Sequence, residues 1–503
     1  MLEGLPLCPR LAGTRLWLFP LFGLPLLLNP VPPQPLYLPR AIKLAYAHGT
    51  RSPDGAPGPN YWENHAQYRI AVQAAPPDST IRGSEQIEYH NNSPDTLRVL
   101  VFKLFSNVHK PGAPRMGGTA VDYLTSGTHI DSFSVNGRPQ PWGNDANVFT
   151  VKAVRLPAPL PPHDSVAMGV TWHYNVTGGG GREGIIDPTT YYLAYFYPRV
   201  AVYDDYNGWD TMDFTGEQEF YSDFNDYDVS ITVPQNYVVW GTGTLMDAAQ
   251  VLQPAPLQRF QASFSSDTTI HVATGAATQA GETTRQDATN TWHFTATNVP
   301  DMAFGVSDHY DWDAASVLVD DATGRRASTQ AAYNDDAQDY HYMVQFARSA
   351  LDFLSHRWPG VPYPYEKSTV FRGFADMEYP MMVNDNSNAD TSFSRFVVAH
   401  EIAHTYFPFY MGINETRYGF MDEGWATTFE YLINQVDMGK PKAEKLYQQF
   451  RVARWASDPS PLEDLPIITP EDVLKGVAYG NNAYGKASLG YLAVKDLLGD
   501  VGE

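Results

Sequence analysis

The segment Ala399-His-Glu-Ile-Ala-His404 contains two histidines spaced four residues apart, with a glutamate directly after the first. On an α-helix this spacing places both imidazoles on one face, one turn apart, where they can hold one Zn²⁺. Glu401 then lies beside the open coordination position of the metal. The apolar spacing of Phe393–Ala399 indicates that the segment is a buried helix. We therefore predict a helix that presents His400 and His404 to a zinc ion; a chance pattern on a structural helix is the alternative.

A second predicted helix follows in Phe420-Met-Asp-Glu-Gly-Trp-Ala-Thr-Thr-Phe-Glu-Tyr431. Eighteen residues separate His404 from Glu423, whose carboxylate can return beside the histidines and complete a His₂Glu zinc site with one open position. Glu430 falls seven residues after Glu423, on the same helix face. It is either a hydrogen-bond partner of a ligand histidine or a solvated glutamate, and the helix face alone does not decide between them.

Residues 61–311 have the pattern of an all-β domain. Ile81–Tyr89 alternates apolar and polar residues, Leu97–Phe105 is rich in β-branched and aromatic residues, and Asn- and Gly-containing turns separate such runs. No helical periodicity of useful length interrupts this part of the chain. We predict a sandwich-like β domain here.

Residues 312–503 are predicted to form an α+β domain. Ala327–His356 has the apolar spacing of an amphipathic helix. Thr369–Phe371 and Met381–Val383 resemble short strands. The remaining predicted helices are Phe393–Phe407, Gly419–Val436, Lys440–Ala456 and Tyr484–Leu498.

The composition excludes several classes of function. Of 503 residues, 43% are hydrophobic, which excludes a disordered chain. The balance of 34 basic and 56 acidic residues argues against a nucleic-acid partner, because phosphate binding needs clustered Lys and Arg. Cys8 is the one cysteine, so disulfides within the chain and thiolate-based metal sites are excluded.

Residues 1–60 are predicted to be a leader or extended segment followed by a turn-rich linker. Arg10 and Arg15 precede the apolar run Leu16–Leu28, which is too short for a membrane-spanning helix but has the order of a signal peptide. The alternative is a proline-rich strap packed on the body of the protein. If residues 1–40 are a targeting segment, we expect export to a periplasmic, extracellular or membrane-associated location; otherwise we expect a cytoplasmic protein.

The zinc motif resembles that of the aminopeptidase N family of zinc metallopeptidases, which includes leukotriene hydrolase. The family pattern is His-Glu-x-x-His followed, after eighteen residues, by Glu, and this chain has His400, His404 and Glu423 in that spacing. The family motif Gly-x-Met-Glu-Asn corresponds to Ala375-Asp-Met-Glu-Tyr379, in which Met and Glu match while Ala and Tyr replace Gly and Asn. A third family motif, Tyr-x-Lys at a helix start, corresponds to Tyr484-Gly-Lys486.

The resemblance implies a sandwich-like β domain followed by a thermolysin-like catalytic domain with one Zn²⁺ per chain. It implies that Glu401 is the general base and that Tyr484 stabilises the oxyanion. It places Glu378 at the α-amine of the substrate. Met377, Tyr379 and Tyr479, a tyrosine that some members share, would also contact substrate. The implied activity is removal of the N-terminal residue from peptides with a free N-terminus.

This chain departs from the family in two respects. The family uses a Glu or Gln of the β domain to help bind the amine, whereas the most similar stretch here, Tyr197-Pro-Arg199, has Tyr at that place. The family usually continues with a helical C-terminal domain, and we expect that domain to be absent here, as in a minimal version or an incomplete chain.

The same residues are compatible with other functions. A zinc endopeptidase or an epoxide hydrolase of the same clan would use the same metal site, and a non-catalytic binding module could use the same scaffold. No feature of the sequence indicates an obligate protein partner. Side-chain preference at the first subsite and the oligomeric state are not predicted.

Overall fold

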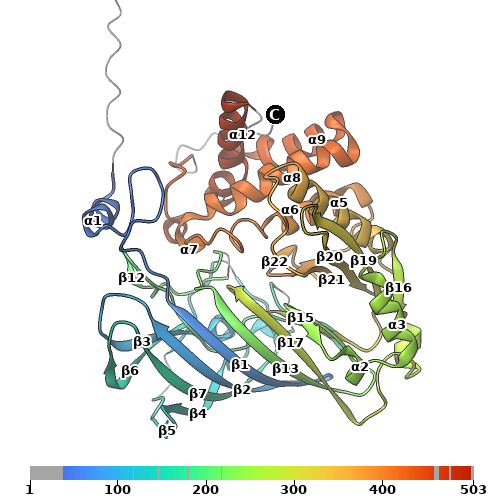
Figure 1. Cartoon of the computed structure of the whole chain (residues 1–503), viewed down its shortest axis with the longest axis horizontal. Coiled ribbons are helices and arrows are strands. Elements are labelled where there is room, and N and C mark those ends of the chain that lie inside the picture. The colour runs from blue at the N-terminus through green and yellow to red at the C-terminus, as the bar shows by residue number, and fades with distance from the viewer. Residues whose placement is uncertain are drawn as a thin grey trace, which may run out of the picture.

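The computed structural model describes residues 38–116, 118–143, 148–178, 181–216, 218–457, 464–474 and 477–499. The predicted leader, with Cys8 and Leu16–Leu28, lies outside the described residues. The first described helix, α1 (Arg40–His48), lies at the left edge of the molecule in Figure 1.

The largest sheet has eight strands in the order β15-β17-β13-β1-β2-β7-β4-β5. Its central strand β1 (His65–Ala75) pairs antiparallel with β2 (Asp78–Asn91) and parallel with β13 (Asn225–Pro234). Along β1, buried and exposed side chains alternate, so one face contributes to the core and the other faces water. The other strands are β4 (His129–Val135), β5 (Arg138–Pro139), β7 (Asp164–Asn175), β15 (Thr244–Met246) and β17 (Thr289–Val299).

Smaller sheets in the same part of the chain share the hydrophobic core of the large sheet. Together these β layers confirm the predicted sandwich-like region, seen in the lower half of Figure 1. The strands of the smaller sheets are β10 (Arg199–Val200), β3 (Leu97–Lys103) and β6 (Val151–Leu160); β14 (Val238–Gly241), β18 (Phe304–Ser307), β9 (Thr190–Leu193) and β8 (Gly184–Asp187); and β11 (Tyr203–Asp204) with β12 (Gly208–Trp209).

A second, six-stranded sheet has the order β16-β19-β20-β21-β23-β22. Its edge strand β22 (Met377–Tyr379) runs antiparallel to β23 (Met382–Asp385), and helix α6 (Thr391–Ala403) packs against both. This edge therefore brings Glu378 to the zinc-motif helix. The remaining strands are β16 (Ile270–Ala273), β19 (Asp311–Asp320), β20 (Arg325–Tyr333) and β21 (Lys367–Arg372). The boundary at residue 311 stays a prediction; β16, which precedes it, pairs with β19.

The helical block lies above the large sheet in Figure 1 and confirms the α+β character of this half. Within it, α6 packs against α8 (Glu423–Met438), and α8 packs against α12 (Ala487–Leu498). The other helices are α5 (Met343–His356), α7 (Glu415–Tyr418), α9 (Lys440–Tyr447), α10 (Ala453–Ala456) and α11 (Ala478–Gly480).

Two details of the predicted secondary structure are wrong. Ala327–Tyr333, predicted as the start of a long helix, belongs to strand β20, and the helix begins only at Met343. Because β20 lies inside the sheet, its residues are buried on both faces and show no alternation, while their alanines favour a helix locally. The β region also contains helices that the sequence pattern does not predict: α2 (Ala248–Val251), α3 (Pro254–Ser263) and α4 (Gly275–Gln279).

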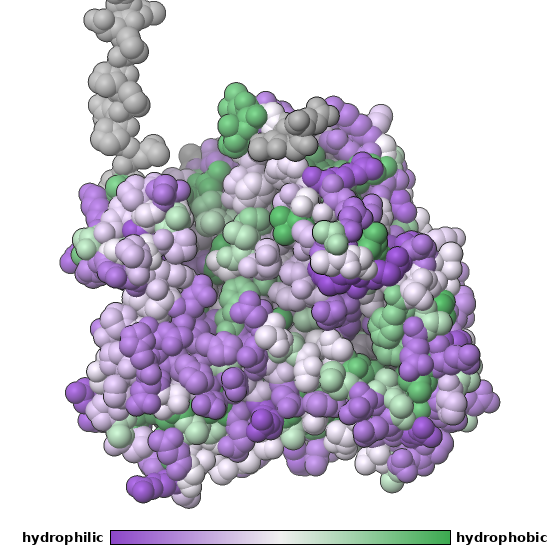
Figure 2. Space-filling model, viewed as in Figure 1, coloured by the Kyte–Doolittle hydropathy of each residue, from purple (hydrophilic) through white to green (hydrophobic). Residues whose placement is uncertain are grey.

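The outer end of α12 is apolar. Val494, Leu497 and Leu498 are exposed there, and Figure 2 shows the corresponding hydrophobic patch at the top of the molecule. Among the described residues, no helix combines the length and the apolar character needed to cross a bilayer.

Candidate metal centre

The three predicted zinc ligands converge at one point. His400 lies in the last turn of α6, His404 directly follows that helix, and Glu423 is the first residue of α8. His400 Nε2 lies 3.2 Å from His404 Nε2 and 3.0 Å from Glu423 Oε2, and His404 Nε2 lies 3.5 Å from Glu423 Oε2. A tetrahedral zinc with bonds of ~2.1 Å holds its ligand atoms about 3.4 Å apart. The donor set and its spacing therefore fit Zn²⁺.

A carboxylate lies beside the outer nitrogen of each imidazole. His404 Nδ1 lies 2.6 Å from Asp422 Oδ1, and His400 Nδ1 lies 3.1 Å from Glu430 Oε2. A carboxylate at Nδ1 favours the proton on that nitrogen, which leaves the Nε2 lone pair for a metal. Glu430 is in turn paired with Arg451, whose Nε lies 3.2 Å from Glu430 Oε2.

The charges around the ligands favour a cation at this point. Burial raises the pKa of Glu378 and Glu401 well above the usual range, and neighbouring carboxylates add to the rise. Burial alone would lower the pKa of His404, but the carboxylates of Glu378 and Asp422 outweigh it and raise that pKa well above its usual value. The raised pKa of His404 indicates that these carboxylates favour a positive charge at this point, which a dication can supply.

A second possible metal group in the described part of the chain is Glu378, His404 and Asp422. It would use His404 Nδ1, which lies 3.8 Å from Glu378 Oε1 and is already bonded to Asp422. This group has only one nitrogen donor, whereas the His₂Glu group has two and leaves the second nitrogen of each histidine beside a carboxylate. The His₂Glu group is therefore the better zinc site.

The predicted base and the predicted oxyanion donor border one cavity. Glu401 and Tyr484 line this cavity of about 330 Å³ together with His400. Glu401 Oε2 is buried and has no hydrogen-bond partner among the described residues. The Tyr484 hydroxyl donates to Glu423 Oε1 at 2.5 Å, and its ring stacks on that of His400 at 5.8 Å. Both functional groups thus lie beside the metal ligands.

The predicted substrate-contacting residues divide into two groups. Met377, Glu378 and Tyr379 are buried on β22 and border a small cavity. The Tyr379 hydroxyl lies 2.8 Å from that of Tyr195 and donates to the Arg182 carbonyl at 2.9 Å, so it links the second sheet to the β region. Tyr479 forms the second group and lies on helix α11.

Tyr479 lies near Tyr484 and contacts a carboxylate of the β region. Its hydroxyl donates to Glu219 Oε1 at 3.4 Å, and its ring centre lies 5.9 Å from that of Tyr484. Glu219 also accepts from Arg182 Nη2 at 2.8 Å, and its charge contributes to the raised pKa of Glu378. A carboxylate of the β region therefore adjoins the predicted amine site.

The stretch Tyr197-Pro-Arg199 does not take that place. The Tyr197 hydroxyl donates to Tyr227 at 2.9 Å, and Arg199 pairs with Asp301 at 2.6 Å, both within the β core. Sequence reasoning missed Glu219, Arg182 and Asp422. Asp422 could have been found, because it directly precedes Glu423 at the start of a helix; no local pattern marks the other two.

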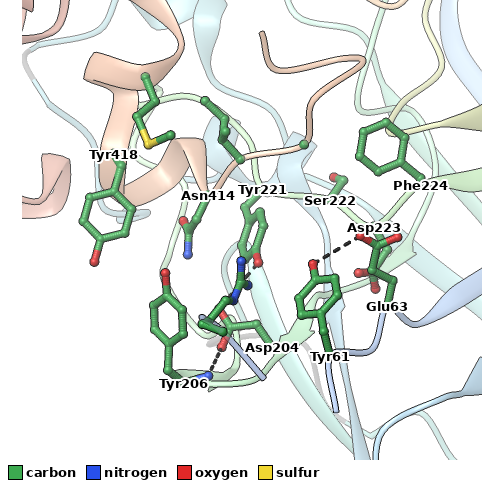
Figure 3. A pocket seen from close by; sticks show the side chains of 14 residues that line it. Tyr61, Glu63, Asp204, Tyr206, Tyr221, Ser222, Asp223, Phe224, Asn414 and Tyr418 are labelled. Carbon is green, nitrogen blue, oxygen red and sulfur yellow. Dashed lines mark hydrogen bonds between the residues drawn. The ribbon is translucent and has the colours of Figure 1, made fainter. Parts of the chain in front are cut away.

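A separate cavity of about 190 Å³ lies among residues 51–63, 204–224 and 412–421, and none of the predicted site residues lines it. Figure 3 shows Tyr61, Tyr206 and Tyr221 around Asp204, with Asn414 and Tyr418 contributed by the helical half. Arg51 also lines this cavity. Its guanidinium pairs with Asp205 at 2.9 Å and lies 4.6 Å from the centre of the Tyr61 ring.

Comparison of the sequence with protein-family models and with curated proteins finds no match. Among solved structures, the M1 zinc metallopeptidase from Deinococcus radiodurans is similar at 16% identity and a TM-score of 0.54, over 88% of this chain and 85% of that chain. A point mutant of that enzyme matches with a TM-score of 0.55 over 88% and 86%, and the same mutant bound to the substrate Tyr-Ser-Ala with a TM-score of 0.52 over 88% and 85%, both at 16% identity. The chain therefore has the fold of these two-domain M1 zinc metallopeptidases, with a candidate zinc site at His400, His404 and Glu423.

Proposed function

We propose that this chain is a zinc aminopeptidase, a hydrolase that releases the N-terminal residue from peptides. The main support is the joint geometry of the centre. Three ligand atoms lie 3.0–3.5 Å apart, with Glu401, Tyr484 and the buried Glu378 around them. A similar two-domain M1 zinc metallopeptidase mutant has been seen with the amino acids L-arginine and L-tryptophan, the kind of product that an aminopeptidase releases.

A bound Zn²⁺ would lower the pKa of a water molecule and polarise the scissile carbonyl. Glu401 would accept the proton of the attacking water and pass it to the leaving amine. Its unpartnered Oε2 and raised pKa suit a group that must hold a proton briefly. The Tyr484 hydroxyl would turn from Glu423 to donate to the developing oxyanion.

Glu378 would restrict the enzyme to chain ends. It is 4% exposed, and its Oε1 lies 3.8 Å from the ligand imidazole of His404. A free α-ammonium would form a charge-assisted hydrogen bond with this carboxylate, whereas an acetylated N-terminus has no charge to offer. Because an endopeptidase has no use for a buried carboxylate at this point, the position of Glu378 favours an exopeptidase.

The test compares one peptide with a free and with an acetylated N-terminus. We expect the zinc-loaded enzyme to cleave only the free form, and a chelator to abolish cleavage. Glu378→Gln should lower kcat/KM for the free peptide by about 10- to 100-fold. The control Glu88→Gln changes an exposed residue of strand β2 and should leave the rate as it is. Equal cleavage of both peptides by the unmodified enzyme would refute the aminopeptidase assignment and leave an endopeptidase.

A further inference from the structure

A cavity of about 220 Å³ lies beside Tyr479. We call it the Glu471 cavity; its lining includes Met116, Met212, Asp213, Glu471, Asp472 and Tyr479. It shares no lining residue with the cavity that contains Glu401. The two cavities are therefore lined by different residues.

The Glu471 cavity is on the amine side of the metal centre. Tyr479, which lines it, bonds Glu219 and packs near Tyr484 at 5.9 Å between ring centres. Gln218, which also lines it, is the neighbour of Glu219, whose charge acts on Glu378. The predicted base Glu401 lines the other cavity. The charges of Asp422 and Glu423 also act on Glu471, so this cavity lies close to the predicted amine site.

Glu471 is the distinctive group of this cavity. It is 5% exposed, and neither carboxylate oxygen has a hydrogen-bond partner among the described residues. Gly419 makes room for it, because a Cβ at Gly419 would lie 1.4 Å from Glu471 Oε1. A buried carboxylate without a partner is unfavourable in the free protein and becomes favourable when a cation pairs with it.

Acidic groups dominate the charges around this cavity. Burial raises the pKa of Glu471, and the charges of Glu219, Asp422 and Glu423 raise it further, against a smaller opposing effect of Arg182. Among the residues that the structure describes, the cavity lining contains three carboxylates and no Lys or Arg. Its apolar surface comes from two methionines and a tyrosine ring, which suit the aliphatic stem of a long side chain.

We propose that the Glu471 cavity receives the side chain of the substrate's first residue and selects arginine or lysine, with Glu471 accepting hydrogen bonds from the cationic head. This inference rests on the proposed aminopeptidase function and names its substrate class. The aliphatic stem would lie against Met116, Met212 and Tyr479. Asp472 is exposed, so solvent would screen its interaction with the cationic head.

The experiment compares the 4-nitroanilides of arginine and citrulline, which differ in charge but scarcely in shape. We expect the zinc-loaded wild-type enzyme to favour the arginyl substrate by about 10- to 150-fold in kcat/KM. Glu471→Gln should bring this ratio close to one. A general loss of activity affects both substrates equally and therefore cancels in the ratio. The matched variant Asp472→Asn should change the ratio by about two-fold or less.

The possible outcomes separate the two proposals. Hydrolysis of alanyl and leucyl anilides with an arginine-to-citrulline ratio near one overturns the Glu471 assignment and leaves the aminopeptidase proposal intact. A ratio that survives in Glu471→Gln and disappears in Asp472→Asn also overturns it. Hydrolysis of no aminoacyl anilide at all refutes the aminopeptidase function, and the substrate preference with it. Calorimetric binding of free L-arginine and L-citrulline to the zinc-loaded protein makes the same comparison without turnover, with tighter arginine binding expected.

Discussion

Replacing Asp422 by asparagine tests how the candidate zinc site would hold a metal. Asp422 Oδ1 lies 2.6 Å from Nδ1 of His404, and the side chain is fully buried. Asparagine has the same shape and keeps an oxygen that can accept from the Nδ1 proton, but it has no charge. The substitution therefore isolates the electrostatic contribution of one carboxylate to a ligand histidine.

The expected size of the effect follows from this contact. Charge-assisted hydrogen bonds are roughly twice as strong as neutral ones, and one between a charged and a neutral group contributes about 1.5–3 kcal/mol. Loss of the charge removes about half of this free energy. Zinc binding should therefore weaken by about 1–1.5 kcal/mol, or roughly 5- to 10-fold. Asp422→Ala removes the acceptor altogether and should weaken it by about 100-fold.

The pH dependence has a defined sign. Asp422 raises the pKa of His404, so in Asp422→Asn the proton that competes with zinc also binds more weakly. Where His404 carries a proton in the metal-free protein, zinc must displace that proton. The weaker proton binding then partly offsets the weaker zinc binding. The weakening of zinc binding should therefore be larger at about pH 8 than at about pH 6.

The assay is competition for zinc with a chromophoric chelator at both pH values. Asp437→Asn is the matched control, since Asp437 lies at the far end of the same helix and accepts from Ser349 at 2.5 Å. It should leave the zinc Kd unchanged. If Asp422→Asn and Asp437→Asn bound zinc equally well at the higher pH, the assigned role of Asp422 would be refuted.

Three further predictions address other residues. Glu401→Gln should lower kcat by about 10²–10⁴-fold with full zinc content by mass spectrometry, and loss of zinc would instead make Glu401 a structural support of the site. Tyr484→Phe should lower kcat by about 10²–10³-fold with little change in KM, and a rise in KM alone would contradict the oxyanion role. Lys367→Met should stabilise the protein at pH 7 by about 2–4 kcal/mol in urea unfolding, because burial lowers the pKa of Lys367 to about 7 and the unfolded chain binds its proton more tightly. This gain should shrink towards about pH 10, where the unfolded lysine also begins to lose its proton, and a variant less stable than the wild type would contradict it.

The candidate zinc ligands could be predicted from sequence because their geometry is largely local. A spacing of four on one helix determines how His400 and His404 face each other, and the same periodicity on the next helix puts Glu430 on the face of Glu423. The all-β and α+β halves were also evident, since strand alternation and helical periodicity are properties of short segments.

Other parts of the site depend on contacts between distant segments. Glu219 and Arg182 meet from different loops of the β region, and the Glu471 carboxylate packs against Gly419, where a side chain would not fit. No spacing rule links such residues. Strand β20 was missed for a related reason: burial by neighbouring strands overrides the helical preference of its alanines.

The most direct measurement of the central claim follows a free peptide by mass spectrometry with native, chelator-stripped and zinc-restored protein. We predict one zinc per chain, stepwise loss of single residues from the N-terminus, no cleavage after stripping, and recovery when zinc returns. Internal fragments, or cleavage that persists without metal, would contradict the account.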